Sequence, residues 1–260
     1  MKRHALLHIL VVLAVCFGFC DFVSAQTAPR KIKVALIYTG TSPQLRADTE
    51  GQVREQLGPD VEILVYAVPE VLQKTTEAGH ITTSAAALWI STYIKAVDDG
   101  ADAVLSVCST VADIAYSMQD AADFTGVPIL IINEEMCREA IKQGKRIAIV
   151  ATLQTSIEPT KKIIARVSRE MGRHDVEVTA VHIDGGYGLE QEKLKALMAD
   201  KVSKIADQVD VIIFSQGSMA YCQEHVATST GKTVLSNPYF GAKALKNALV
   251  AKGLAQNLAQ

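Results

Sequence analysis

The chain carries one structural segment twice, and this internal repeat constrains its fold more than any other feature. Residues 102–112 (DAVLSVCSTVA) align without a gap on residues 210–220 (DVIIFSQGSMA). The alignment places Cys108 opposite Gln216, so only one copy has a cysteine at the turn. Three further pairs of segments recur in the same order: 34–39 with 147–152, 60–63 with 175–178, and 126–130 with 231–235. This extent of self-similarity indicates two copies of one supersecondary unit.

The repeated segments are expected to be strands. Each is a short run rich in Val, Ile and Leu between turn residues, which is typical of strands buried on both faces of a parallel sheet. The intervening segments mix charged residues with apolar positions three and four apart, and they are long enough for right-handed helical crossovers. The predicted helices are 43–57, 84–97, 110–124, 158–171, 189–206, 218–228 and 239–254. The predicted fold class is α/β, with two similar doubly wound parallel-sheet domains related by pseudo-twofold symmetry.

The domain boundaries follow from the order of the repeats. Residues 26–136 together with 236–260 are predicted to form the first α/β domain, and residues 137–235 the second, each of an ordinary domain size. No Gly/Ser-rich or Pro-rich linker separates the two parts. We therefore expect two small sheets that are tightly apposed, with a cleft between them.

The first 25 residues are predicted to be a signal peptide. Three basic residues, Lys2, Arg3 and His4, precede an apolar stretch from residue 5 to about 19, and Val23-Ser24-Ala25 offers a cleavage site. We expect an exported protein, periplasmic or extracellular, without stable membrane insertion after the signal is removed. An uncleaved membrane anchor is the alternative, although the apolar stretch is short for a span.

Export would leave an odd number of cysteines, which are Cys108, Cys137 and Cys222. A disulfide between Cys137 and Cys222 would leave Cys108 free in an oxidising compartment. The sequence leaves open whether these two residues lie close enough to pair. The alternative is that both are free thiols, buried or at the surface.

Composition excludes several function classes. Without the signal, removal of Lys2, Arg3 and Asp21 from 26 basic and 28 acidic residues leaves 24 and 27. There is no basic stripe and few aromatic residues, so neither a nucleic-acid partner nor a membrane-surface patch is expected. The chain has no GxGxxG after its first strand, no P-loop, no HExxH and no CxxC, and we expect no cofactor and no metal. The glycine-rich segment 185–188 is interpreted as a flexible turn rather than a ligand loop.

Cys108 is the main candidate for chemistry. It lies at the carboxyl end of its predicted strand, where open parallel sheets bind ligands. Ser109 or Thr110 is expected to cap the following helix, whose dipole would lower the pKa of the thiol. The resulting thiolate could abstract a proton or attack carbon. The alternative is a small cysteine at the edge of the core without a chemical role.

Short polar residues at the other strand ends are consistent with an anionic ligand. Backbone N–H groups at paired helix N-termini, together with hydroxyl groups, form a cradle suited to a carboxylate. The candidate substrate-binding residues are Thr39, Thr41, Ser42, Ser109, Thr110, Thr152, Thr155, Gln216, Gly217 and Ser218. For any single threonine, simple helix capping is the alternative. His182 is interpreted as a strand-end or surface histidine, with a residue that reaches the cleft as the alternative, and Glu134 and Glu135 are interpreted as part of a solvated loop.

At these residues the chain resembles the aspartate/glutamate/hydantoin racemase superfamily. The similarity rests on residues 100–110, 126–136, 146–155 with Glu158-Pro159, and 210–220, and it extends from about Lys33 to Lys252. The resemblance implies two similar domains with a substrate cleft at their interface, and no cofactor. It also implies two catalytic cysteines, one per domain, on opposite faces of the substrate α-carbon. Homodimers are common in the resembled family, so a homodimer is left open.

By matching position, Cys108 would be the first of these two bases. The second position holds Gln216, whose amide does not exchange a proton at ordinary pH. We therefore expect a cofactor-independent enzyme of this superfamily that acts on a small carboxylate or amino-acid derivative, with Cys108 as acid/base or nucleophile. The alternatives are a one-cysteine decarboxylase or lyase, a racemase in which water or a displaced residue serves the opposite face, and a non-catalytic exported carboxylate-binding protein.

Overall fold

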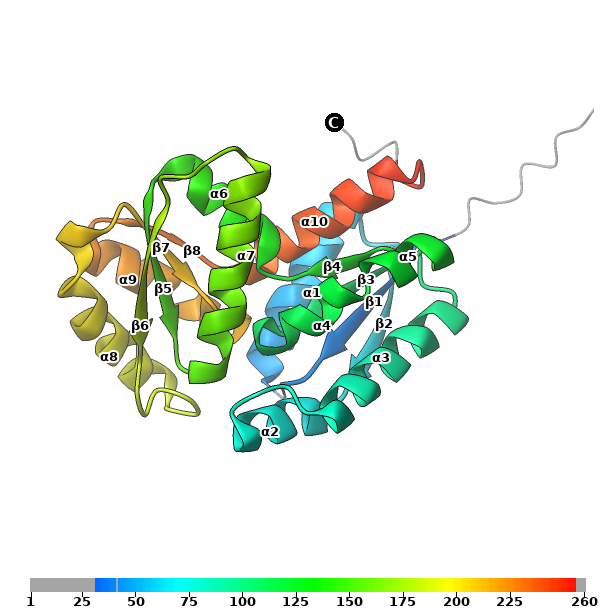
Figure 1. The fold of residues 1–260 in the computed structure, drawn as a ribbon, viewed down its shortest axis with the longest axis horizontal. Helices are drawn as coiled ribbons and strands as arrows, with labels where there is room; N and C mark the ends of the chain where they lie inside the picture. The colour runs from blue at the N-terminus through cyan, green and yellow to red at the C-terminus, as the bar shows by residue number, and fades with distance from the viewer. Residues whose placement is uncertain (1–30, 41, 256–260) are drawn as a thin grey trace, which may run out of the picture. The chain divides into compact units, whose positions relative to one another are not determined.

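The strands form two parallel sheets of four strands each in the computed structural model, which describes residues 31–40 and 42–255. The strands are β1 (Lys33–Tyr38), β2 (Glu62–Ala67), β3 (Ala103–Val107), β4 (Ile129–Ile131), β5 (Arg146–Ala151), β6 (Glu177–His182), β7 (Val211–Phe214) and β8 (Thr233–Leu235). Their orders are β2-β1-β3-β4 and β6-β5-β7-β8 (Figure 1). The predicted α/β fold with two similar parallel sheets is confirmed.

Ten α-helices and four 3₁₀ segments lie within the described residues. The α-helices are α1 (Pro43–Leu57), α2 (Pro69–Ala78), α3 (Thr83–Asp98), α4 (Ala112–Ser117), α5 (Gln119–Thr125), α6 (Glu134–Gln143), α7 (Ile157–Glu170), α8 (Gln191–Ser203), α9 (Gln223–Thr230) and α10 (Asn237–Ala251). The 3₁₀ segments are η1 (Ser109–Val111), η2 (Gln154–Ser156), η3 (Ala206–Gln208) and η4 (Gly217–Cys222). No helix in the described part of the chain is long and apolar enough to cross a membrane.

The two sheets have the same strand register, as the repeat predicts. Ala35 of β1 pairs with Val104 of β3, and the aligned residues Ala148 and Ile212 pair in the second sheet. One aspartate in each copy also secures the start of the neighbouring strand. Asp102 accepts a hydrogen bond from the Lys33 N–H at 2.9 Å. Asp210 accepts bonds from the N–H groups of Lys145 and Arg146 at 3.1 and 2.9 Å, and it also pairs with the Arg146 guanidinium.

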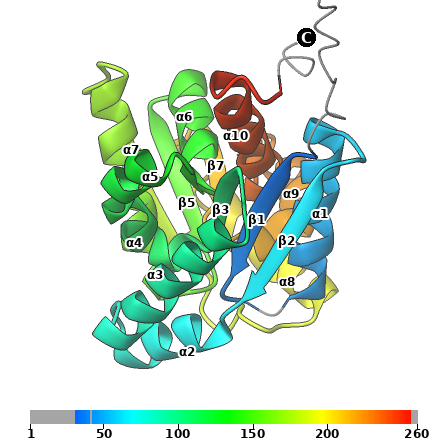
Figure 2. The ribbon, with the colours of Figure 1, turned by 90° about the vertical axis from the view of Figure 1, so that its right-hand side faces the viewer.

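Helices cover both faces of each sheet. One face of the first sheet packs against α1 and α10, and its other face packs against α2 and α3. In the second sheet, α8 and α9 cover one face while α6 and α7 cover the other. Figure 2 shows β1 between β2 and β3, with α1 on one side of this sheet and α3 on the other. The strands between two neighbours are almost fully buried, whereas β2 is half-exposed and β6 is mostly exposed. Burial on both faces is therefore wrong for these two edge strands.

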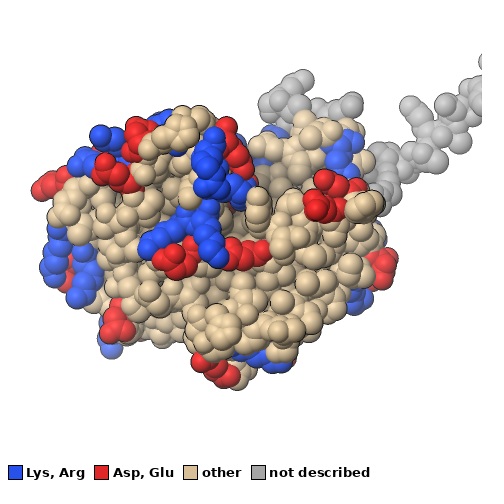
Figure 3. All heavy atoms as spheres, in the orientation of Figure 1, with Lys and Arg blue, Asp and Glu red and all other residues tan. Residues whose placement is uncertain are grey.

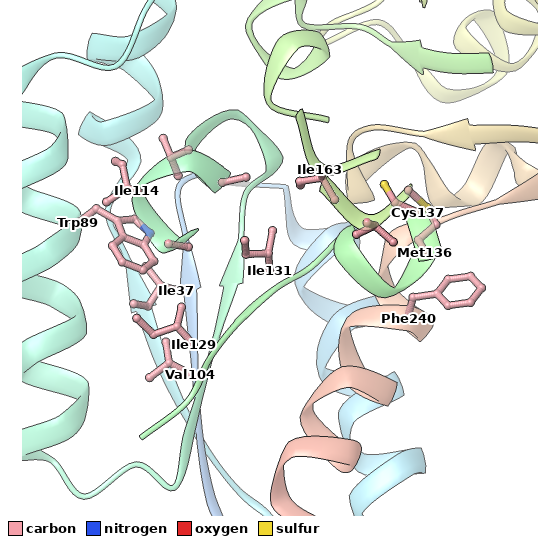
Figure 4. Packing of buried hydrophobic residues seen from close by; sticks show 14 of the residues in the cluster. Ile37, Trp89, Val104, Ile114, Ile129, Ile131, Met136, Cys137, Ile163 and Phe240 are labelled. Carbon is pink, nitrogen blue, oxygen red and sulfur yellow. The ribbon is translucent and has the colours of Figure 1, made fainter. Parts of the chain in front are cut away.

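A single apolar cluster joins the helical layers between the two sheets. It includes Trp89 and Ile37 from the first half and Ile149 and Ile163 from the second. Trp89 is fully buried, and its ring lies parallel to that of Tyr93 with 6.4 Å between the ring centroids. Figure 4 shows how side chains from both halves, including Ile131 and Ile163, approach one another in this cluster. The two sheets are thus apposed through a shared core.

Helix α6 corrects one sequence-based expectation. Glu134 and Glu135 do not lie in a solvated loop but form the first turn of this helix, where acidic side chains are stabilised by the helix dipole. Glu134 pairs with Arg166 of α7 at 2.8 Å. The Arg166 guanidinium also lies 4.3 Å from the ring centre of Tyr116 in α4. These residues therefore form part of the contact between the two halves.

Other helices differ from their predicted extents. The predicted helix 110–124 is divided into η1, α4 and α5, with Met118 in a non-helical conformation between the two α-helices. Helix α2 was not predicted because only Val71 and Thr75 of its ten residues are buried, which leaves a weak periodic pattern. The predicted boundary between residues 136 and 137 falls inside α6, and the division into domains stays a prediction. The predicted signal peptide lies outside the described residues.

Charged residues of both signs are mixed on the surface. Figure 3 shows Lys and Arg side chains interspersed with Asp and Glu on one face, without a stripe of a single sign. Many of these residues form ion pairs along single helices, such as Arg46 with Glu50 and Lys204 with Asp200. Surface pairs of this kind contribute little to stability. This face shows no concentration of charge suited to a polyanionic partner.

Candidate functional site

A cavity of about 450 Å³ lies where the carboxyl ends of strands from both sheets meet. Its walls are the segments that follow β1, β3, β5 and β7, together with the loop that follows β6. Nine of the candidate residues line it: Thr39, Ser42, Cys108, Ser109, Thr110, Thr152, Gln216, Gly217 and Ser218. The ends of parallel strands are where α/β proteins of this kind bind ligands.

Three candidates are placed differently. Thr41 lies outside the described residues. Thr155 does not line the cavity, and its buried hydroxyl has no hydrogen-bond partner within residues 31–40 and 42–255. His182 is exposed at the end of β6 and is not part of the cavity wall. The interpretation of His182 as a strand-end residue is therefore correct. Ser42 lines the cavity but also caps α1, because its Oγ accepts a hydrogen bond from the Leu45 N–H at 3.2 Å.

Cys108 is partly exposed at the cavity wall, directly after β3. Burial raises the pKa of its thiol above the ordinary value of 9.0, and hydrogen bonding from the Thr39 hydroxyl, the Val111 and Thr110 N–H groups and the Thr110 hydroxyl only partly opposes this rise. The expected lowering of the pKa is thus wrong. Neither Ser109 nor Thr110 caps an α-helix, because a 3₁₀ turn intervenes and the six-residue α4 begins at Ala112. A short, displaced helix provides too small a dipole to overcome desolvation.

The Thr39 hydroxyl lies beside this cysteine and faces its sulfur. The residue is only 1% exposed, and no oxygen or nitrogen atom of the described residues forms a hydrogen bond with its Oγ1. A buried hydroxyl without such a partner costs free energy. At a cavity wall it is therefore available to donate to a ligand oxygen or to a thiolate at Cys108.

Gln216 occupies the aligned position in the second half and makes a different set of contacts. Its Oε1 accepts hydrogen bonds from the Thr152 N–H at 2.7 Å and the Leu153 N–H at 3.0 Å. Its Nε2 lies 3.0 Å from the Thr152 hydroxyl, in position to donate to it. Two converging backbone donors fix the orientation of the amide because only its oxygen can accept them. The side chain is thus held against the turn that follows β5.

Behind Gln216 lies a buried polar network. The hydroxyls of Ser215 and Thr160 are 2.9 Å apart, and both donate to the main-chain carbonyl of Ser156. The Asn237 side-chain amide donates to the Ser215 carbonyl at 2.9 Å. All four residues are buried. The hydrogen bonds of Ser215 hold the backbone next to Gln216 in place.

The glycine-rich loop after β6 forms part of the cavity wall, which the interpretation as a flexible turn missed. Gly186, Tyr187 and Gly188 all line the cavity. A Cβ at Gly186 would lie 2.9 Å from the Ile183 carbonyl oxygen and 3.0 Å from Thr152 Cγ2, so the loop packs closely on the β5 turn. The position of this segment directly after a strand was the signal that could have identified it.

The two other cysteines are structural. Cys137 is buried in the cluster shared by both halves, whereas Cys222 is buried between the second sheet and α8 and α9. Both are free thiols, so the disulfide left open by the sequence is not formed. Burial raises the pKa of Cys222 to about 11 and that of Cys137 further. The described residues contain no cluster of His, Cys, Asp and Glu that could hold a metal ion.

Comparison with known protein families shows to which family the chain is related. A family model of the Asp/Glu/Hydantoin racemases matches residues 34–245. The chain belongs to this racemase family. The match spans both sheets and every segment that lines the cavity, so the family relationship includes the site as well as the scaffold.

Solved structures support the same fold. Glutamate racemase RacE1 from Bacillus anthracis is 14% identical, with a TM-score of 0.66 over 87% of this chain and 84% of that one. Allantoin racemase from Klebsiella pneumoniae is 20% identical, with a TM-score of 0.60 over 86% of this chain and 90% of that one. An arylmalonate decarboxylase is 15% identical, with a TM-score of 0.54 over 84% and 92%. Among curated proteins, no match was found.

Proposed function

We propose that this racemase-family protein is a cofactor-independent enzyme that transfers a proton on one face of a small carboxylate or amino-acid derivative. Cys108 is the acid/base of the reaction. The observation that carries the proposal is the asymmetry of the cavity: a thiol lies on one wall, and an amide held by hydrogen bonds occupies the equivalent position on the other. An amide has no proton to exchange at ordinary pH, so the position aligned with Cys108 supplies no second acid or base.

The first half provides the contacts for the substrate carboxylate. The buried Thr39 hydroxyl has no oxygen or nitrogen partner in the described part of the chain, and Ser109 and Thr110 line the same wall as Cys108. Short hydroxyls and turn N–H groups are suited to a carboxylate. A carboxylate bound there would place the adjacent carbon near the thiol. This arrangement serves positioning as well as recognition.

A one-cysteine decarboxylase or lyase is the second candidate, and the protonation state of Cys108 favours it. Burial raises the pKa of this thiol, so the group is protonated near neutral pH. A thiol can donate its proton to the carbanion that forms when carbon dioxide, or another electrophilic group, departs and leaves both electrons of the broken bond on the carbon. The resulting thiolate then takes a proton from solvent. Abstraction of an α-proton would instead require the thiolate from the start.

Deuterium incorporation distinguishes these candidates. With amino acids and small carboxylates in deuterated water, one-sided exchange should place deuterium at the α-carbon with retention of configuration. This rate should rise with pH, because the thiolate fraction rises toward the raised pKa of Cys108. Decarboxylation should give one enantiomer of deuterated product at a rate that is flat through neutral pH and falls only in the alkaline range where the raised pKa of Cys108 is approached.

Two other outcomes would contradict the proposal. Equal loss of optical activity from either enantiomer would show that water or a displaced residue serves the opposite face. Tight carboxylate binding that is unchanged in Cys108→Ala, without chemical change in the ligand, would show a binding protein.

We also propose that the protein is exported. The support is the basic, apolar and small-residue pattern of residues 1–25. Expression of the full chain in a bacterial host should yield a soluble form that begins at Gln26 in the osmotic-shock fraction. N-terminal sequencing of that fraction provides the measurement. Retention of residues 1–25 in a membrane pellet would instead show an anchor.

A further inference from the structure

We propose that Gln216 fills the carboxylate-binding position of the second half, which is formed by the N–H groups of Thr152 and Leu153 and is called the seat below. The cavity then offers a single carboxylate seat, beside Cys108. It therefore selects against ligands that carry a carboxylate at each end. The inference deepens the proposed function and rests on it. It makes Gln216 a specificity-determining residue rather than a neutral replacement of an acid/base group.

The contacts of Gln216 define the seat. The N–H groups of Thr152 and Leu153 converge on one oxygen at 2.7 and 3.0 Å, and the Thr152 hydroxyl lies 3.2 Å from the same oxygen. Convergent backbone donors with a neighbouring hydroxyl are the arrangement by which proteins hold carboxylate or oxyanion oxygens. In this protein the oxygen comes from the chain itself. The amide oxygen thus stands where one oxygen of a ligand carboxylate would otherwise be bound.

The repeat shows that the first half differs at this point. Thr39 aligns with Thr152, and Cys108 aligns with Gln216. A cysteine side chain is shorter than that of glutamine and lacks a carbonyl oxygen, so it cannot fill the equivalent seat in this way. In agreement, Thr39 Oγ1 is buried and has no oxygen or nitrogen partner among the described residues, whereas Thr152 Oγ1 is within hydrogen-bond distance of the amide. The first half thus lacks the internal carbonyl oxygen that Gln216 supplies to the Thr152 turn.

Displacement of the Gln216 amide from the Thr152 and Leu153 N–H groups would cost free energy. Gln216 is only 8% exposed, and its backbone is anchored by the Asn237 side chain through the adjacent Ser215 carbonyl. A carboxylate that displaced the amide would have to replace its hydrogen bonds and also leave the amide with new partners. A buried amide without partners is costly. The N–H donors of Thr152 and Leu153 are already bonded to Gln216. The turn therefore discriminates against a second ligand carboxylate.

Paired acids of equal chain length test the inference. Succinate and butyrate differ in whether the far end carries a carboxylate. Isothermal titration of the wild-type protein should show weaker binding of succinate than of butyrate. Gln216→Ala should open the seat and raise the affinity for succinate, relative to butyrate, by roughly tenfold or more, the value of a newly made charge-assisted contact. Gln216→Glu is the matched control, because its side chain is isosteric and keeps the seat occupied.

A direct readout uses the two backbone amides of the seat. In wild-type protein, the ¹⁵N–¹H signals of Thr152 and Leu153 should stay in place during a succinate titration, and in Gln216→Ala they should shift. This measurement on the wild-type protein needs no variant to fold. Movement of both signals in wild-type protein would overturn the inference, and so would an unchanged succinate-to-butyrate ratio in a folded Gln216→Ala. Absence of binding by either acid to that variant would overturn it as well.

Failure here is distinguishable from failure of the proposed function. The affinity ratio and the amide signals do not require turnover, whereas the proposed function is decided by deuterium transfer at Cys108. Solvent deuterium transfer that depends on Cys108, together with an unchanged affinity ratio, would leave the enzyme assignment intact and remove only the role of Gln216.

Discussion

Replacement of Cys108 by alanine should lower the rate of proton transfer by roughly 10²–10⁴-fold, the range that a positioned acid/base group contributes. The expected loss follows because the position aligned with Cys108 on the opposite wall holds the Gln216 amide, which is neither an acid nor a base at ordinary pH. Single-turnover measurement of deuterium incorporation reports the step directly. Substrate affinity should change little, since the thiol is one small group in a cavity of about 450 Å³.

Two further variants test whether the loss of rate reflects the chemistry of the thiol, the size of the side chain or general damage to the fold. Cys108→Ser replaces the thiol by a hydroxyl of similar size that ionises far less readily, so this variant should be nearly as slow as the alanine variant. Cys137→Ala removes another buried thiol, which packs in the shared core and does not line the cavity. It should retain the wild-type rate. Equal losses in Cys108→Ala and Cys137→Ala would show that the effect on rate is structural, and undiminished transfer in Cys108→Ala would refute the assignment.

Replacement of Trp89 by alanine should destabilise the fold by about 3–5 kcal/mol, the usual cost of removing a buried aromatic side chain. Trp89 belongs to α3, is fully buried where this helix packs on the first sheet, and stacks on Tyr93. This loss of stability combines the lost transfer free energy of a large apolar side chain with the cost of the cavity that its removal leaves. Urea denaturation followed by circular dichroism measures the effect, because this is the only tryptophan and its fluorescence is lost with it.

Trp89→Phe is the control for this prediction. Phenylalanine fills much of the same volume, and it also removes the indole Nε1, which is buried without a hydrogen-bond partner among the described residues. Its cost should be well below that of alanine. Equal destabilisation by the two substitutions would show that the specific indole shape, and not the buried volume, carries the stability.

The internal repeat predicted most of the fold. The matched segments 34–39 and 147–152 became the inner strands β1 and β5, and the aligned residues of both copies pair in the same register. This works because a one-residue shift in register would turn buried side chains toward the wrong face. The same repeat identified the strand ends, and nine of the ten described candidates lie around one cavity.

The properties that depend on local burial were not predictable in the same way. The expected low pKa of Cys108 assumed a helix directly after the cysteine, but a 3₁₀ turn and a six-residue helix follow it. Propensity alone does not reveal this break, because the composition of residues 110–124 suits a continuous helix. The role of Gln216 was hidden for a related reason. Its side-chain amide accepts hydrogen bonds from Thr152 and Leu153, which lie 64 and 63 residues earlier in the chain. No sequence pattern predicts that contact.

The place of α10 in the chain has a consequence for biosynthesis. This helix buries Leu36 and Leu105 of the first sheet through Leu245 and Leu249, yet it follows β8 and therefore the whole of the second sheet. The second sheet and its helices are contiguous and can be completed as they leave the ribosome. The first sheet, which is followed by Cys108 at the end of β3, has only α1 on this face until α10 has been translated. The half of the molecule that bears Cys108 is thus the last to be completed.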